Sequence, residues 1–169
     1  MMKTIEMVCD KASGIVERIT KLILIPLSLG FTLLVFLAVL TRFVFQVPIV
    51  SSLEYSRICF VWFCFLGGSL AYKTKAHVRF VFMISKFPKL YAELLQLIVN
   101  LLSLTFFSVM LYQSVLLNIK VTITRFPASG LPYGVMYLSL PVAMLFCAVH
   151  SVLFITRNIQ TIQQIRRAT

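Results

Sequence analysis

Four long stretches without a charged residue constrain this chain more than any other feature of its sequence. They contain 20, 15, 26 and 31 residues, at 22–41, 58–72, 94–119 and 126–156. A helix needs about 20 mostly apolar residues to cross the hydrocarbon core of a bilayer. Hydrophobic residues make up 60% of the 169 residues and charged residues 12%, which is more apolar material than a soluble domain of this size can bury. We therefore predict an all-α integral membrane protein with four transmembrane helices.

The expected organisation is a single membrane domain over 1–169. Its transmembrane helices are predicted at 22–44, 51–73, 93–119 and 134–157. The second helix has to begin before Arg57, because its 15 uncharged residues cover only about 22 Å of a core about 30 Å thick. Glu54 is thereby drawn toward the boundary of the bilayer.

Two amphipathic segments accompany these helices. In 1–21, apolar residues recur three and four positions apart, which predicts a helix that lies on the membrane interface or continues into the first transmembrane helix. A second interfacial segment is expected at 76–92, where aromatic and aliphatic residues alternate with Lys and Arg.

The basic residues indicate a topology. Twelve of the sixteen Lys and Arg precede the first expected helix, lie between the second and third, or follow the fourth, and four lie on the other side. The positive-inside rule then places both termini in the cytoplasm. The net charge of +11 is spread over helix ends and forms no single stripe, so nucleic acid is not an expected partner.

The residues needed for catalysis or cofactor binding are scarce. Three of the five carboxylates belong to 1–21, and the four cysteines have no C-x-x-C spacing. His77 lies in a basic segment, so only His150 is left in a helix and two facing histidines cannot hold a haem. We expect no enzymatic activity, no metal site and no cofactor.

Glu54 leaves two interpretations open. It precedes Arg57 by three residues on one helix face, and Arg42 ends the first helix on the same side of the membrane. An ion pair that joins the helix ends is one interpretation. The alternative is a self-sufficient, proton-coupled small exporter, because a carboxylate inside a membrane is costly and usually functional.

Other residues predict contacts between helices. A small-residue strip in 51–73 contains Gly67, Gly68 and Ala71. A polar stripe in 93–119 faces either its own bundle or a second chain, and contains Gln96, Asn100, Ser103 and Ser114. Prolines and glycines at 127–134 predict an ordered turn before the fourth helix. Pro141 is expected inside that helix, where it kinks the segment.

The run VFLAVLTRFVFQVPIVSSLEYSRICFVWFCFLGGSLAYKTKAHVRF resembles the signature of the small membrane subunit, Q, of tripartite ATP-independent periplasmic (TRAP) transporters. In that family an Arg ends the first helix, a Glu and an Arg precede a W-x-x-F-L-G core, and a His follows a basic loop. The matching residues here are Arg42, Glu54, Arg57, Trp62, Phe65, Leu66, Gly67 and His77. The later GLPYGVMYLSLPVAMLFCAVH resembles the C-terminal pattern of the family through Pro132, Tyr137, Pro141 and His150. Family members commonly carry an Asp where this chain has Val81.

The chain is most similar to unfused small subunits of sialic acid TRAP transporters. The resemblance implies a non-catalytic scaffold subunit of the bacterial inner membrane, in a sodium-coupled importer of an organic acid. Its implied partners are a large membrane subunit (M), a periplasmic substrate-binding protein (P) and membrane lipids. The coupling sodium is expected to bind the large subunit. The residues singled out above are then candidates for structural or subunit contacts.

Overall fold

The computed structural model describes residues 2–46, 50–74 and 89–168. Within these ranges the chain is helical apart from short connections. The elements are α1 Met2–Phe43, α2 Val50–Lys73, α4 Lys89–Val121, α5 Gly134–Tyr137 and α6 Ser139–Ala168.

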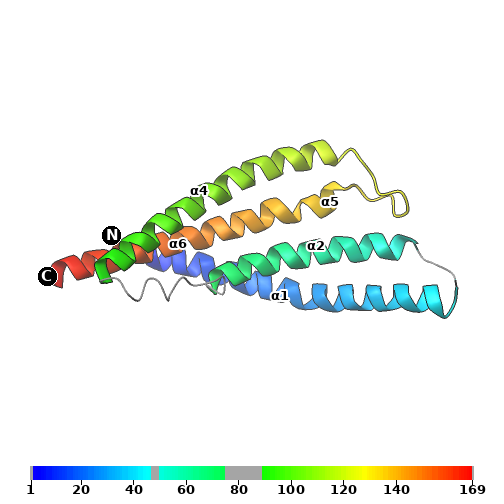
Figure 1. Cartoon of the computed structure of the whole chain (residues 1–169), viewed down its shortest axis with the longest axis horizontal. Helices are drawn as coiled ribbons and strands as arrows, with labels where there is room; N and C mark the ends of the chain where they lie inside the picture. The colour runs from blue at the N-terminus through cyan, green and yellow to red at the C-terminus, as the bar shows by residue number, and fades with distance from the viewer. Residues whose placement is uncertain (1, 47–49, 75–88, 169) are drawn as a thin grey trace.

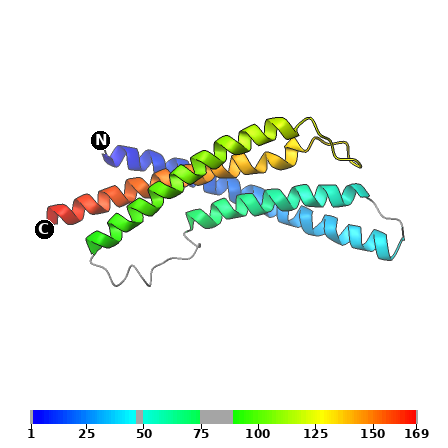
Figure 2. The same cartoon turned by 45° about the horizontal axis from the view of Figure 1, so that its top comes forward.

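The four long helices form an elongated bundle. Both termini lie at one end, where α4 also begins, whereas α2 ends nearer the middle, and the connection between α4 and α5 lies toward the opposite end (Figure 1). The helix α6 contacts α1, α2 and α4, whereas α1 packs mainly on α2 and α4 mainly on α6. Figure 2 shows the first part of α1 crossing α6 near the termini. The core therefore follows α6.

Three helices are long and apolar enough to cross a membrane: Asp10–Phe43, Tyr91–Val121 and Gly134–Ile165. In the most apolar 18-residue stretch of each of the first two helices, 0% of the residues are buried within the chain. In the corresponding stretch of the third helix 44% are buried. α2 is not among the described helices that are long and apolar enough, so the fourth membrane span stays a prediction. Over the described ranges the chain is helical as predicted, and three of its helices have the length and composition of membrane spans.

The first helix is longer than the predicted transmembrane segment. α1 runs without interruption from Met2 to Phe43, so that the described part of 1–21 continues directly into the first transmembrane segment. Pro26 lies inside it, but only one backbone donor is lost there and the helix continues. Of the two alternatives for 1–21, the structure has the continuation. A location of 1–21 at the membrane interface stays a prediction.

The fourth predicted helix is divided in two. α5 ends at Tyr137 and α6 begins at Ser139, so Pro141 is the third residue of a helix and not an interior residue as expected. A proline in the first turn costs no helical hydrogen bond, because those N–H groups have no partner within the helix. The interruption at Leu138 takes the place of the expected kink, and α6 extends beyond 157 to Ala168.

Candidate functional site

Glu54 holds the connection between α4 and α5. Its carboxylate oxygens accept hydrogen bonds from the backbone N–H groups of Ala128 at 3.0 Å and Ser129 at 2.7 Å, and the residue is 9% exposed. Ser51, one turn earlier on α2, donates from its hydroxyl to the carbonyl oxygen of Ala128 at 3.4 Å. Hydrogen bonds to an ionised carboxylate are stronger than neutral ones. The head of α2 is thus tied to a connection more than 70 residues away.

Of the partners left open for Glu54, neither Arg57 nor Arg42 forms an ion pair with it among the described residues. The ion pairs among the described residues involve Glu17 and Asp10 but not Glu54, and Arg57 and Arg42 are both exposed. Arg42 instead lies with its guanidinium carbon 5.8 Å from the centre of the Phe43 ring. Each oxygen of Glu54 accepts one backbone N–H group. Hydrogen bonds of this kind favour the ionised carboxylate over its protonated form.

The connection itself is an ordered turn, as predicted. The N–H of Phe126 donates to the carbonyl of Leu131 at 2.8 Å, and the N–H of Tyr133 donates to that of Thr124 at 2.9 Å. Gly130 has a φ of 68°, in the left-handed region that glycine adopts at little cost. Phe126 is 2% exposed and stacks on Tyr133 with ring centres 3.9 Å apart. A rigid turn of this kind fixes the N–H groups that Glu54 binds.

Two further contacts position α5. Trp62 on α2 donates its indole N–H to the carbonyl of Val135 at 2.9 Å. Asn118 on α4 donates its side-chain amide to the carbonyl of Gly134 at 3.0 Å. Gly134 is buried and so close to Thr122 that an added Cβ would clash with its side chain. Trp62, one of the sequence candidates, therefore has a structural partner within the chain.

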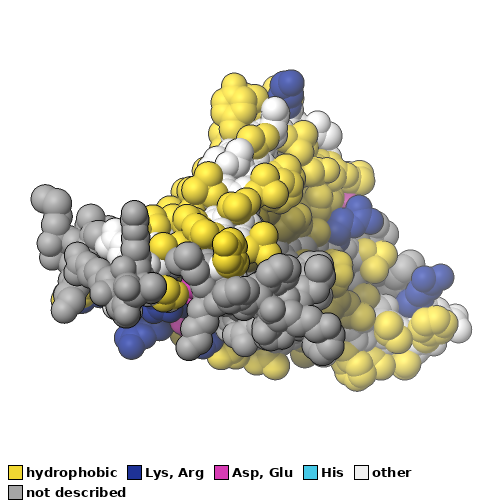
Figure 3. All heavy atoms as spheres, turned by 60° about the vertical axis from the view of Figure 1, so that its left-hand side comes forward, with side chains coloured by type: hydrophobic (Ala, Val, Ile, Leu, Met, Phe, Trp, Pro, Cys, Tyr) yellow, Lys and Arg dark blue, Asp and Glu magenta, His cyan; other side chains and the backbone are white. Residues whose placement is uncertain are grey.

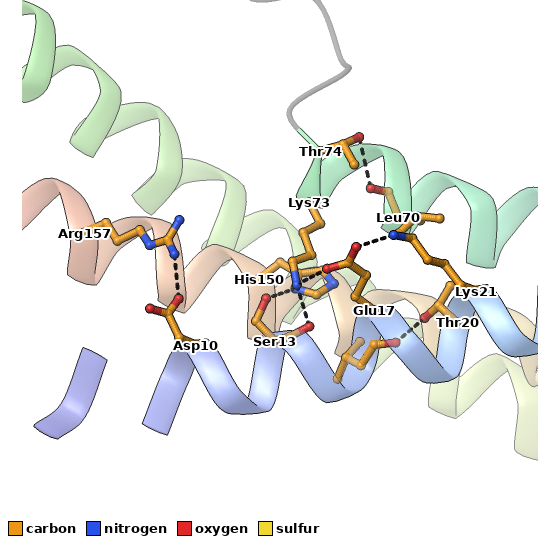
Figure 4. Close-up of polar contacts among 11 residues, drawn as sticks. Asp10, Ser13, Glu17, Thr20, Lys21, Leu70, Lys73, Thr74, His150 and Arg157 are labelled. Atoms are coloured by element: carbon orange, nitrogen blue, oxygen red, sulfur yellow. Dashed lines mark hydrogen bonds and ion pairs between the residues drawn. The ribbon is translucent and has the colours of Figure 1, made fainter. Parts of the chain in front are cut away.

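A second group of polar residues joins α1, α2 and α6 toward the end that carries the termini (Figure 4). We name Ser13, Glu17, Lys73 and His150 the polar junction. The Lys73 ammonium donates to the carbonyl of Ser13 at 2.8 Å and pairs with the Glu17 carboxylate at 2.7 Å. The Ser13 hydroxyl lies 2.8 Å from Nδ1 of His150, and these two residues are 0% and 1% exposed. One residue from each of α2 and α6 thus holds the same stretch of α1.

Two ion pairs flank the polar junction. Lys21 pairs with Glu17 one helical turn away, and Arg157 on α6 pairs with Asp10 at 2.7 Å. Sequence reasoning missed this site. A signal was present in α1, where Ser13, Glu17 and Lys21 are each four residues apart on one face. The partners on α2 and α6 gave no comparable signal.

The polar junction is unsuited to catalysis. A serine near a histidine can act as a nucleophile and base, but that chemistry needs a substrate beside the hydroxyl and a group that orients the ring. Ser13 and His150 are both buried, and the nearby carboxylate, Glu17, binds two lysines. Within the described ranges no three potential metal ligands come together. The arrangement fastens helices to each other.

The polar stripe of α4 faces its own bundle. Ser114 is 3% exposed and donates to the carbonyl of Leu111, and Ser103 donates to that of Val99. The carbonyl of Asn100 accepts a hydrogen bond from Ser151 on α6 at 3.1 Å. Gln96 and Asn100 are half-buried. The contact with α6 is made by the Asn100 backbone, so for the side chains of Gln96 and Asn100 the choice between the bundle and a second chain stays open.

The small-residue strip of α2 is open. A Cβ added at Gly67 or Gly68 would meet no atom within 4 Å. Gly68 lines a partly open pocket of about 210 Å³ between α2, α4 and α6, together with Tyr72, Phe107 and Cys147 among others. Ala71, on the same helix, is half-buried. Among the helices that the structure describes, none packs closely against the two glycines.

Two of the remaining candidates are placed as follows. Pro132 is half-buried in the α4–α5 connection, and its carbonyl accepts a hydrogen bond from the N–H of Val135 at 3.1 Å. His77 and most of the predicted interfacial segment 76–92 lie outside the described residues. Residues 89–92 belong to the first turn of α4.

Comparison with known proteins then decides the family. The family described as "Tripartite ATP-independent periplasmic transporters, DctQ component" matches residues 31–161. The chain belongs to the DctQ family. It is therefore a TRAP transporter small permease subunit and a multi-pass protein of the inner membrane. The resemblance drawn from its sequence is confirmed, and such subunits are transporter components, not enzymes.

Three relatives show how far the likeness extends. A TRAP transporter small permease protein of Haemophilus influenzae is 28% identical over 148 residues, which cover 87% of this chain and 89% of the relative. A second such protein from that organism is 30% identical over 106 residues, or 63% of this chain and 64% of the relative. The isethionate TRAP transporter permease protein DctMQ of Oleidesulfovibrio alaskensis is 31% identical over 98 residues, or 57% of this chain and 15% of that protein.

Proposed function

We propose that this DctQ chain is a non-catalytic scaffold subunit, which packs against the static part of a large membrane subunit. The observation that carries the proposal is the match to the DctMQ permease of Oleidesulfovibrio alaskensis. The matched 98 residues make up only 15% of that protein, so a DctQ unit occurs there within a much larger permease. The likeness over 89% of the small permease protein of Haemophilus influenzae supports assembly from separate chains for this protein. Its partners are the large M subunit, a periplasmic binding protein and lipids.

The contacts of the polar residues support a scaffold. Both oxygens of Glu54 are used by the α4–α5 connection, and the polar junction is used to join three helices. A carrier needs polar groups that can release a proton, an ion or a solute and bind it again. The polar groups of Glu54 and of the polar junction instead form hydrogen bonds and ion pairs that hold the helices together.

The membrane topology belongs to the same proposal. All four long helices cross the bilayer, with α2 as the shortest at 24 residues, and both termini face the cytoplasm. Glu54 and the α4–α5 connection then lie on the periplasmic side. Hydrophobic side chains cover much of the described surface seen in Figure 3, as contact with lipid or another membrane protein requires.

The transported solute is an organic acid, with sodium as the coupling ion bound by the large subunit. Sialic acid is the substrate proposed from the sequence resemblance, whereas the Oleidesulfovibrio alaskensis relative is named for isethionate. Both are organic anions, which supports the class. The choice between such anions would then be made by the binding protein and the large subunit.

Reconstitution tests this function. The large subunit and the binding protein are placed in liposomes with or without this chain, and uptake of radiolabelled sialic acid and of isethionate is measured under an inward sodium gradient. We expect uptake of one anion only when all three proteins are present. Equal uptake without this chain would contradict a required scaffold. Uptake driven by this chain with a proton gradient would favour the exporter that uses Glu54.

A further inference from the structure

The outward face of α1 has the chemistry of a lipid contact. In the most apolar 18-residue stretch of this helix, 0% of the residues are buried within the chain. Residues three and four apart along it are apolar and 59–74% exposed, and they include Leu22, Leu29, Leu33 and Phe36. Thr32 is exposed nearby, but its hydroxyl donates to the carbonyl of Ser28 at 2.8 Å. Lipid acyl chains alone can therefore cover this face.

The outward face of α4 is equally uncovered, but it carries polar side chains among its apolar ones. Thr105, Ser108, Tyr112 and Gln113 are all exposed, and the spacing of three and four residues among the first three places them on one side of the helix. This side is opposite to the stripe that contacts α6. Apolar side chains surround these residues, among them Ile98, Leu102, Val109 and Leu116.

Two of the four polar residues lack a partner. The hydroxyls of Thr105 and Ser108 donate to carbonyls of their own helix, at 3.0 and 2.8 Å. In the part of the chain that the structure describes, neither the Tyr112 hydroxyl nor the Gln113 amide makes a hydrogen bond. Hydrogen-bonding groups in hydrocarbon are costly when unpaired.

Gln113 lies deep enough in its transmembrane helix for the free-energy cost of an unpaired amide in hydrocarbon to apply. It lies in the charge-free run 94–119, seven residues before Lys120, which is about 10 Å along a helix. Tyr112 is one residue deeper. The amide is therefore within the apolar part of the span, and a lipid tail cannot bond to it. A neighbouring transmembrane helix with a polar side chain can.

We propose that the outward face of α4, made of Thr105, Ser108, Tyr112 and Gln113, contacts a transmembrane helix of the large permease subunit. Gln113 and Tyr112 form hydrogen bonds across this contact, and the short side chains of Thr105 and Ser108 allow close approach. The outward face of α1 remains in lipid. This inference rests on the proposed scaffold function and adds the surface that performs it.

Photocrosslinking in the assembled complex tests this surface. A photoreactive aromatic amino acid replaces Val109 on the outward face of α4, and in a matched variant it replaces Leu33 on the outward face of α1. Both positions are exposed in the chain, at 55% and 60%. After co-expression and illumination, we expect a crosslinked product with the large subunit from position 109 and none from position 33.

The outcomes separate the two proposals. If the large subunit co-purifies but position 109 gives no crosslink, or position 33 alone gives one, the inferred surface is wrong and the scaffold function stands. If the large subunit does not co-purify with the unmodified chain, the scaffold function fails and the inferred surface fails with it.

A substitution tests the hydrogen bond. Gln113→Leu should weaken association with the large subunit by about threefold or more, the effect of one interhelical hydrogen bond in a membrane. Thr32→Val on α1 removes a hydroxyl that bonds only to its own helix, and should leave association unchanged. Equal association of Gln113→Leu and the unmodified chain in a titration of labelled subunits in nanodiscs would overturn the role of Gln113.

Discussion

Glu54 lies on α2, where this helix contacts the α4–α5 connection. The sequence predicted that this residue matters but not which groups it contacts. Its isolation among apolar residues predicted its importance, and its spacing from Arg57 suggested a local partner. The actual partners are backbone N–H groups of Ala128 and Ser129. Backbone donors leave no trace in the sequence, so this contact could be found only from the fold.

Glu54→Gln should loosen the connection and leave transport intact. Glutamine offers one acceptor oxygen where the carboxylate offers two, so a charge-assisted hydrogen bond is lost. We expect the melting temperature of the purified complex to fall by about 2–4 °C. Glu93→Gln is the control, because Glu93 makes no hydrogen bond or ion pair with other described residues. Loss of transport in a complex that melts normally would instead assign Glu54 a part in coupling.

Gly134→Ala should destabilise the chain through a direct clash. The added methyl group would meet the side chain of Thr122, and the buried position allows little adjustment. Such overpacking costs about 1–3 kcal/mol. Gly68→Ala is a matched control, because a Cβ there meets no atom within 4 Å. Thermal unfolding of both variants, followed by tryptophan fluorescence, checks the difference, and equal melting temperatures would show that the connection can shift.

At the scale of helices, the positions of the elements follow from the sequence and their contacts do not. The charge-free runs located the apolar parts of α1, α2, α4 and α6. The amphipathic pattern of 1–21 fitted a helix in either of two settings, because periodicity describes a face and not what covers it. The continuous α1 and its partners Lys73 and His150, 60 and 137 residues from Ser13, depend on the packing of three helices.

Lys73→Met should free the first part of α1 from α2. The ammonium is the one group of α2 that contacts both Ser13 and Glu17, and its side chain is only 18% exposed. Loss of these contacts should cost about 1–3 kcal/mol. We expect hydrogen exchange of backbone amides in 10–21 to accelerate by about tenfold or more.

Lys21→Met provides the comparison for that experiment. Lys21 pairs with the same carboxylate, but its side chain is 56% exposed and its partner lies on its own helix. Such pairs contribute about 0.3–0.5 kcal/mol. Exchange in 10–21 should change by less than about threefold. If the two variants behaved alike, the polar junction would not be what holds α1.

At the scale of the whole molecule, polar residues divide into those that hold the bundle together and those that are left over. The side chains of Glu54 and of the polar junction bond to other parts of the bundle. Among the residues that the structure describes, Tyr112 and Gln113 on the outward face of α4 make no hydrogen bond. Sequence analysis found the family, but it left the α4 stripe open between its own bundle and a second chain, because exposure cannot be read from spacing alone.

The central claim is that this DctQ subunit provides a fixed frame and carries no solute. The most direct measurement is made on the chain alone, purified and sealed in liposomes, with sodium and proton gradients applied in turn. Uptake or efflux of labelled organic anions and of a fluorescent cationic substrate of small exporters is then followed over time. We predict fluxes equal to those of empty liposomes under every gradient. Gradient-driven accumulation of any of these solutes by the chain alone, abolished by Glu54→Gln, would contradict the claim.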